Sequence, residues 1–349
     1  MKLGIEILGN YWLRSMKLKL FSDVALMAQT IMVFEKIVPN SARLGIPLLV
    51  VVYLTRGFAY GFFIPYSIAF IVDGLRGANS NSIKLGVGLL VTLAVVFVVT
   101  EIAQMFFFKK LPRIIVTLKQ LVVKTIENSS NASDDREDLV GKISSDVDFI
   151  VWNVNAFLTT LLPNLFTALT ALFSTLTFNI SIGLIVTSTL TPYIVYAEVY
   201  SRIIEKYRSQ ERRAYAQSVV YVKNIVYGDR SSREDLDNVL LKWEHAINKI
   251  MWMDRYYFAL GFTTCFLSIS YIAILAIRRV EESYLGIGAF AGMLHASLSA
   301  HIGMLNAMWA FCIQGQTIAT IKRILSYIQL VEKLKSHEKR TVHIMTRAC

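Results

Sequence analysis

The sequence predicts an all-α membrane protein whose six long transmembrane helices extend into the cytoplasm. Hydrophobic residues make up 54% of the 349-residue chain, charged residues make up 17%, and the mean hydropathy is +0.49. Soluble domains usually carry about 25% charged residues. The net charge of +11 suits cytoplasmic loops of a membrane protein, so no nucleic-acid partner is expected.

A helix needs about 20 predominantly apolar residues to cross a bilayer. Six segments qualify, and several are long enough to continue beyond the membrane. They are Gly45–Val72, Leu85–Phe108, Phe149–Phe178, Ile180–Tyr200, Tyr256–Ile277 and Tyr284–Ile313. The joints alternate between short and long, with Asn179 alone between the third and fourth segments. The short joints therefore lie on one side of the membrane and the long joints on the other.

The distribution of Lys and Arg predicts the orientation. Of the 36 Lys and Arg residues, 31 lie in the N-terminal segment, the two long joints and the C-terminal tail, and four lie in the short joints. Because cytoplasmic loops carry the excess of positive charge, both termini and both long joints are expected in the cytoplasm of a multi-pass cell-membrane protein.

The sequence divides into a cytoplasmic or interfacial segment over 1–43, a six-helix domain over 44–330 and a basic tail over 331–349. Ser22–Val38 is apolar but short, which favours an amphipathic helix at the cytoplasmic interface. The alternative is a seventh span, which would place the N-terminus outside the cell.

The long joints are predicted to be helical. Apolar residues in Leu111–Glu127 recur at the i, i+3, i+4, i+7 spacing of an amphipathic helix. Arg202–Tyr227 continues the fourth span, and Ser232–Arg255 leads to the fifth. The result is two cytoplasmic helical hairpins with polar turns, called here the first tip (residues 128–138) and the second tip (residues 222–233).

Three stretches resemble the transmembrane domain of type I ATP-binding cassette (ABC) exporters over roughly residues 40–330. The first begins at Asp138 and contains Gly141, Asp146 and Val147; the second is Val222-Lys223-Asn-Ile-Val-Tyr227-Gly228; the third is Gly286-Ile-Gly288, followed later by Arg323-Ile-Leu325. The resemblance implies a homodimer or heterodimer of such domains. It also implies that the tips dock onto a nucleotide-binding subunit, with Asp134, Asp135, Glu137 and Asp138 facing a basic groove there.

Two departures from the family pattern stand out. Gln217-Ser-Val-Val220 stands where the family often has a Glu before the second tip, and no G-x-x-x-x-G-K-[ST] phosphate loop occurs in the chain. This chain is therefore not expected to be an enzyme or to bind ATP and Mg²⁺ itself. Three explanations stay open: the ATPase is a separate subunit, it was removed from a longer chain, or ATP coupling was lost.

Charged residues within spans are costly in lipid and mark functional or paired sites. Arg56 and Glu101 lie at similar depths, so they are candidates for an ion pair, either in the inner translocation cavity or with a purely structural role. Glu198 is interpreted as interfacial.

His295 and His301 point about 120° apart on one helix, which is poor for shared metal ligation, and no metal site is expected. Gly288-x-x-x-Gly292 favours close helix packing.

The leading hypothesis is a transporter subunit that forms a translocation pathway as a dimer and is driven by ATPase subunits on separate chains. The alternative is a membrane scaffold or channel-like subunit with the same fold. A membrane-embedded enzyme is disfavoured because the spans contain no HExxH, GxSxG or clustered carboxylates.

The orientation is testable by cysteine labelling. Cysteines introduced at Lys2, Asp134, Arg230 and Lys339 should resist a membrane-impermeant thiol reagent in intact cells, whereas one at Ser80 should react, because the positive charges hold the first four positions in the cytoplasm. Labelling at Lys2 without labelling at Lys339 would favour the seven-span alternative.

Overall fold

The computed structural model describes residues 45–109, 111–127, 147–149, 151–153, 155–228 and 232–312. The predictions made for residues 1–44, for the first tip and for the C-terminal tail lie outside these ranges. Within them the chain forms helices joined by turns. The elements are α3 (Gly45–Arg76), α4 (Ser80–Phe108), α5 (Leu111–Glu127), a π-helical turn (Phe157–Leu161), α7 (Leu162–Phe178), α8 (Ile180–Val226), α9 (Ser232–Glu281) and a helix over residues 287–312.

Five of the described helical segments are long and apolar enough to cross a membrane: Leu49–Arg76, Ser80–Gln120, Val147–Phe178, Ile180–Val226 and Arg233–Glu281. The sixth predicted span forms helix 287–312. Its polar residues, among them His295, Ser297 and His301, make it less apolar than the others. Ser297 and His301 are fully buried, so this helix presents polar groups to protein neighbours instead of to lipid. The described residues thus form an all-α membrane fold, as the sequence predicts.

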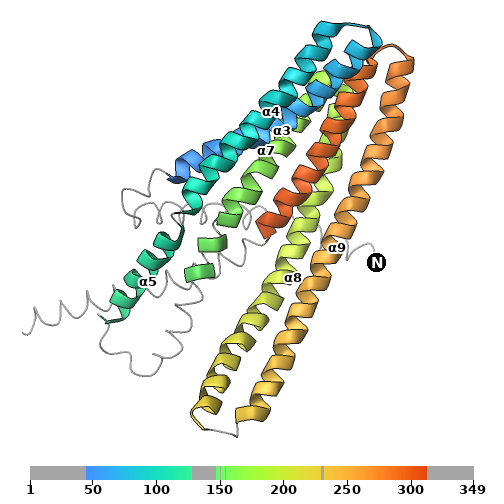
Figure 1. Ribbon diagram of the computed structural model, residues 1–349. Coiled ribbons are helices and arrows are strands. Elements are labelled where there is room, and N and C mark those ends of the chain that lie inside the picture. The colour runs from blue at the N-terminus through green and yellow to red at the C-terminus, as the bar shows by residue number, and fades with distance from the viewer. Residues whose placement is uncertain are drawn as a thin grey trace, which may run out of the picture.

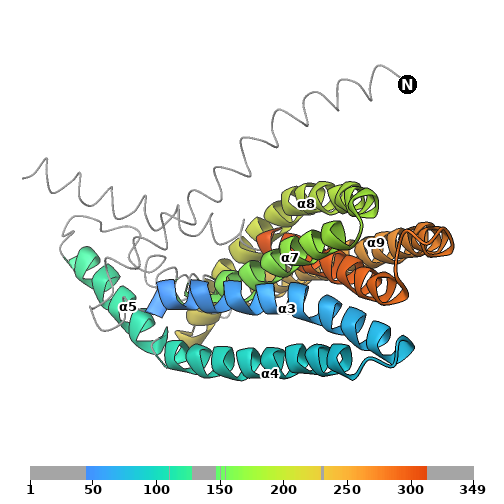
Figure 2. The same ribbon diagram turned by 90° about the horizontal axis from the view of Figure 1, so that it is seen from above.

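The helices are arranged as a bundle with one long extension (Figure 1). The α3–α4, α7–α8 and α9–287 connections lie at one end of the bundle, and α8 and α9 run side by side to a tip far beyond the opposite end. Seen from above, α3 lies between α4 and α7, and α5 turns away from the direction of α4 (Figure 2). The three short joints therefore lie at one end, as predicted, and the long helical joint between α8 and α9 lies at the other. The first tip lies outside the described residues.

Of the three short joints, one lies where the sequence predicted it, and the other two have different bounds in the structure. Asn179 separates α7 from α8, and its side-chain oxygen accepts a hydrogen bond from the Ile182 backbone N–H at 3.1 Å, capping α8. The joint predicted over Asp73–Lys84 is shorter, because α3 continues to Arg76 and α4 begins at Ser80. The joint predicted over Arg278–Ser283 likewise begins later, because α9 continues to Glu281.

Span three contains a π-helical turn over Phe157–Leu161, two residues before Pro163. Proline lacks a backbone N–H, and its ring clashes with the carbonyl four residues earlier, here that of Thr159. Widening the helix into a π turn separates these groups without ending the span. By contrast, Pro65 and Pro192 lie inside uninterrupted helices.

Two glycines bring the backbones of α3 and α7 together. A Cβ atom added at Gly57 would lie 2.6 Å from the Pro163 carbonyl oxygen, and one added at Gly61 would lie 2.6 Å from that of Thr167. Hydroxyl groups of α7 complete the contact: Thr170 donates to the Gly57 carbonyl at 3.3 Å and Ser174 to that of Gly61 at 3.1 Å. Small residues with cross-helix hydrogen bonds are the usual basis of tight packing in membranes.

The main core joins α8, α9 and helix 287–312. Hydrogen bonds link helix 287–312 to its neighbours here. The Tyr257 hydroxyl donates to the Leu305 carbonyl at 3.0 Å, the Cys312 thiol donates to the Ala197 carbonyl at 3.1 Å, and Thr189 Oγ1 lies 3.1 Å from His301 Nε2. His301 Nδ1 lies 2.8 Å from the Ser297 carbonyl oxygen, which can only accept. Nδ1 therefore carries the proton, and Nε2 accepts from Thr189 when the ring is neutral.

The glycine contact predicts a difference between two Gly→Leu substitutions. Gly61→Leu should lower the free energy of unfolding by about 1–3 kcal/mol, because the added side chain forces α3 away from α7. Gly88→Leu in α4 is the matched control, since a Cβ atom at Gly88 meets nothing within 4 Å. Thermal unfolding in detergent measures both variants. Equal unfolding midpoints would show that the α3–α7 contact does not limit stability, and Gly61→Ala provides a smaller change if the leucine variant is poorly expressed.

Candidate functional site

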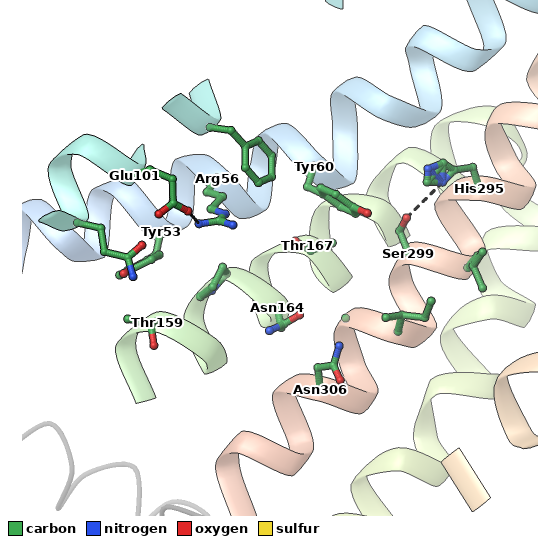
Figure 3. A pocket seen from close by; sticks show the side chains of 16 residues that line it. Tyr53, Arg56, Tyr60, Glu101, Thr159, Asn164, Thr167, His295, Ser299 and Asn306 are labelled. Carbon is green, nitrogen blue, oxygen red and sulfur yellow. Dashed lines mark hydrogen bonds and ion pairs between the residues drawn. The ribbon is translucent and has the colours of Figure 1, made fainter. Parts of the chain in front are cut away.

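A cavity of about 580 Å³ lies among α3, α4, the span over 147–178 and helix 287–312 (Figure 3). Helix α3 contributes Tyr53, Arg56 and Tyr60, and α4 contributes Phe97, Glu101 and Gln104. The opposite side is formed by the third span and by helix 287–312. Their lining residues are Thr159, Pro163, Asn164, Thr167, His295, Leu298, Ser299, Ile302, Gly303 and Asn306.

Arg56 and Glu101 form an ion pair on the wall of this cavity. Arg56 Nη1 lies 2.6 Å from Glu101 Oε1. The Arg56 side chain is 29% exposed and the Glu101 side chain is 55% exposed. The guanidinium carbon also lies 4.5 Å from the centre of the Phe97 ring, a cation–π contact. The carboxylate and the aromatic ring both stabilise the charge of Arg56, while its remaining N–H groups can still bind a ligand.

Tyr53 is one helical turn from Arg56 and is almost completely buried, with 1% of its surface exposed. Its hydroxyl has no hydrogen-bond partner among the residues that the structure describes. A buried polar group without a partner costs about 1–3 kcal/mol, so a group that supplies the missing hydrogen bond in this cavity gains that amount. Tyr53 therefore marks a position where a bound molecule or water would be favoured.

The wall opposite the ion pair is polar and uncharged. Asn164 donates from Nδ2 to the Thr160 carbonyl at 2.7 Å, which leaves its side-chain oxygen as an acceptor. His295 Nδ1 lies 3.4 Å from Ser299 Oγ, and Asn306 is two turns further along the same helix face (Figure 3). A molecule in the cavity thus meets hydroxyls and amides on one side and a cation with aromatic rings on the other. Hydrogen-bonding groups, a cation and aromatic rings around one cavity suit ligand binding.

Gly288 and Gly292 lie where helix 287–312 touches α3. A Cβ atom added at Gly292 would lie 2.5 Å from the Pro65 carbonyl oxygen, and one at Gly288 would clash with Ala69 and Asp73. Asp73 Oδ1 accepts a hydrogen bond from the Gly288 backbone N–H at 2.8 Å. Because a carboxylate also interacts favourably with a helix N-terminus, Asp73 anchors this helix on α3.

Of the second tip, the structure describes residues 222–228 and 232–233. Lys223 Nζ lies 5.9 Å from the centre of the Tyr227 ring, and Tyr227 is 80% exposed. Gly228 follows α8 with a φ of +98°, a conformation that glycine adopts without strain, and its N–H donates to the Ile225 carbonyl at 3.0 Å. The tip residues lie far from the cavity, at the other end of α8 (Figure 1). Asp134, Asp135, Glu137, Asp138, Gly141 and Asp146 lie outside the described residues.

Several ionisable residues that the sequence singled out do not share the cavity. Glu198 lies in α8 with 7% of its surface exposed, and His301 is fully buried between α8 and its own helix. Only His295 of the two histidines lines the cavity.

Sequence inspection did not find Tyr53, Asn164, Asn306 or Asp73. One signal was available for Asp73, an acidic residue at the end of a span, but its partner Gly288 is 215 residues away. The polar residues Asn164 and Asn306 interrupt otherwise apolar spans, and such interruptions indicate residues that face protein or water. The Gly57-x-x-x-Gly61 spacing that fixes α3 was also visible in the sequence.

Residues 48–231 match the model of the family described as the ABC transporter transmembrane region. The chain belongs to this family. A search of curated proteins finds no match. The matched range contains α4, α7, α8 and nearly all of α3, so it includes both charged residues of the cavity and the described end of the second tip. Residues 48–231 are thus a transmembrane component of an ABC transporter, the part that forms the translocation pathway in this family.

The ion pair predicts a measurable coupling between Arg56 and Glu101. In a double-mutant cycle of Arg56→Gln and Glu101→Gln, each single variant leaves one charge unpaired, and the double variant leaves none. We expect a coupling of about 1 kcal/mol or more in the free energy of unfolding, measured in detergent.

Arg279 and Glu282 provide the matched control, because they form a longer, more exposed pair at 3.6 Å. Surface pairs at this spacing contribute about 0.3–0.5 kcal/mol. A coupling for Arg56 and Glu101 no larger than that of the control would mean that the cavity wall is as well solvated as the protein surface.

Proposed function

We propose that two copies of this chain, or this chain and a homologue, form the translocation pathway of an ABC transporter driven by ATPase subunits on separate chains. The match to the ABC transporter transmembrane region carries this proposal, because it covers the cavity-lining helices and the helix that ends at the second tip.

In this proposal the cavity beside Arg56 and Glu101 is part of the pathway. Charged groups within spans are tolerated where they face water or a ligand, and Glu101 is about half exposed. The cavity is lined by α3, α4, the third span and helix 287–312, while α8 and α9 pack on the other side of helix 287–312. A second bundle placed against α3 and α4 would close the open side and complete a pathway between the two copies.

The energy in this proposal comes from ATP and Mg²⁺ bound to the partner subunits. The described residues are helices and short turns without a glycine-rich phosphate loop, so they do not fit a nucleotide. The chain instead supplies the docking tips, where Tyr227 is an exposed aromatic residue on a glycine-capped helix end. Aromatic residues of this kind often contribute most of the binding energy at protein interfaces.

The docking role predicts a loss of motor binding without a loss of stability. Tyr227→Ala should change the free energy of unfolding by no more than about 0.5 kcal/mol, because the residue is exposed. It should weaken retention of the ATPase subunit during purification in mild detergent by about 2 kcal/mol or more, equivalent to roughly thirtyfold in affinity. Mass spectrometry identifies the retained subunit, and a titration with it measures the affinity.

Tyr215→Ala is the matched control, since Tyr215 is also exposed on α8 but lies about three turns before Tyr227. Retention of the ATPase subunit should be unchanged in this variant. If Tyr227→Ala binds the subunit as tightly as the control does, then the second tip is not the docking site.

A further inference from the structure

A second hollow, of about 700 Å³, lies between α8 and α9 and belongs to neither the cavity nor the tips. Among its lining residues, α8 provides Lys206 and Tyr207, and α9 provides Lys249, Trp252 and Tyr256. The spacing of the α9 residues is i, i+3, i+7, so they share one helix face. We call this hollow the basic–aromatic groove.

The groove lies at the level where the two helices leave the membrane. The apolar part of α8 ends at Tyr200, and that of α9 begins at Tyr256. Trp252 is one turn from Tyr256, about 6 Å along the helix. Trp and Tyr are enriched at this boundary, because their rings lie among the headgroups of the lipid.

The two aromatic residues remain exposed in the bundle. Trp252 and Tyr256 are 62% and 58% exposed, and their ring centres lie 6.1 Å apart. Two large, adjacent rings in this position form an apolar floor on which an acyl chain can pack. Tyr207 faces them from α8.

The charge of the groove is positive. No described carboxylate lines it, and neither Lys206 nor Lys249 has an ion-pair partner among the residues that the structure describes. Asp254 and Glu244 are the nearest acidic residues along α9, and each lies about 140° around the helix from Lys249. The ammonium groups of Lys206 and Lys249 at the headgroup level therefore attract a phosphate, and the rings below them accept the attached hydrocarbon.

We propose that the basic–aromatic groove binds a phospholipid with an anionic headgroup, the phosphate between Lys206 and Lys249 and the upper acyl chain against Trp252 and Tyr256. With the orientation proposed from the charge distribution, this lipid belongs to the cytoplasmic leaflet, where anionic lipids attract such lysines. The proposal depends on the groove residues and on the position of α8 and α9 in the membrane. It does not depend on motor docking or on transport.

Brominated lipids test the proposal, because bromine on an acyl chain quenches tryptophan fluorescence only at short range. The full chain is reconstituted in phosphatidylcholine vesicles that contain brominated phosphatidylglycerol or brominated phosphatidylcholine at equal fractions. The chain has five tryptophans. The quenching that is due to Trp252 is therefore obtained by subtracting the quenching of the Trp252→Phe variant from that of the wild type. The concentration dependence then gives the relative affinity for the two lipids.

We expect Trp252 to prefer the anionic lipid, and Lys206→Gln and Lys249→Gln each to lower that preference about fivefold. Both lysines are exposed, so the variants should fold, which the unfolding midpoint verifies. Lys242→Gln is the matched control. Lys242 lies on the same face of α9 but about 10 Å further from the membrane, one Debye length, so its loss should change the preference less than twofold.

Three outcomes would overturn the proposal. An equal affinity for both lipids, or a preference that survives both lysine substitutions, would show that the lysines do not bind the headgroup. Quenching of Trp252 by neither lipid would show that protein, such as a second copy of the chain, covers the groove. Displacement of the anionic lipid by inorganic phosphate, but not by sodium chloride of equal ionic strength, would assign the site to soluble phosphate.

Discussion

The close contact between α3 and α7 is the constraint on which the rest of the bundle depends. Lipid is as apolar as leucine, so helices in a membrane gain little by burying apolar surface against each other. They associate through tight packing and cross-helix hydrogen bonds, and Gly57 and Gly61 allow both at once. Gly288 and Gly292 do the same between helix 287–312 and α3. Helix α3 is thus held on two sides, and Arg56, the residue before Gly57, is held in place with it.

This packing explains how a charged residue can occupy the middle of α3. An unpaired Arg at the centre of a membrane helix costs about 2.5–3.5 kcal/mol on insertion scales. Here the cost is reduced by Glu101, by the face of Phe97 and by the cavity itself, which leaves both charged side chains partly exposed. The ion pair, the glycine contacts and the cavity therefore depend on one another: a looser α3–α7 contact would move Arg56 away from the wall that stabilises its charge.

The sequence predicted the bounds of the helices better than it predicted which helices pack against each other. Periodicity gave the bounds of α5, and an isolated polar residue gave the α7–α8 joint at Asn179. The α3–α4 joint was predicted too long, because Asp73 and Arg76 were interpreted as loop residues, although charged residues are common in the last turn of a helix that leaves the membrane. Of the residues that line the cavity, Arg56 and Glu101 were the two that the sequence analysis predicted as a pair there. Hydropathy tells which residues lie in a span but not which spans are adjacent, so Tyr53, Asn164 and Asn306 had no common signal.

The continuity of α8 gives the second tip a packed connection to the cavity. The helix is unbroken for 47 residues, or about 70 Å, even though Pro192 lies within it. Near its membrane end Thr189 contacts His301, and Ala197 accepts a hydrogen bond from Cys312 at 3.1 Å. Both contacts are with helix 287–312, which carries Ser299 and Asn306 on the cavity wall. Because close-packed interiors transmit strain, we expect a displacement of α8 to act on helix 287–312 through these contacts. A break in α8 between the second tip and Ala197 would separate the two sites while leaving each of them intact.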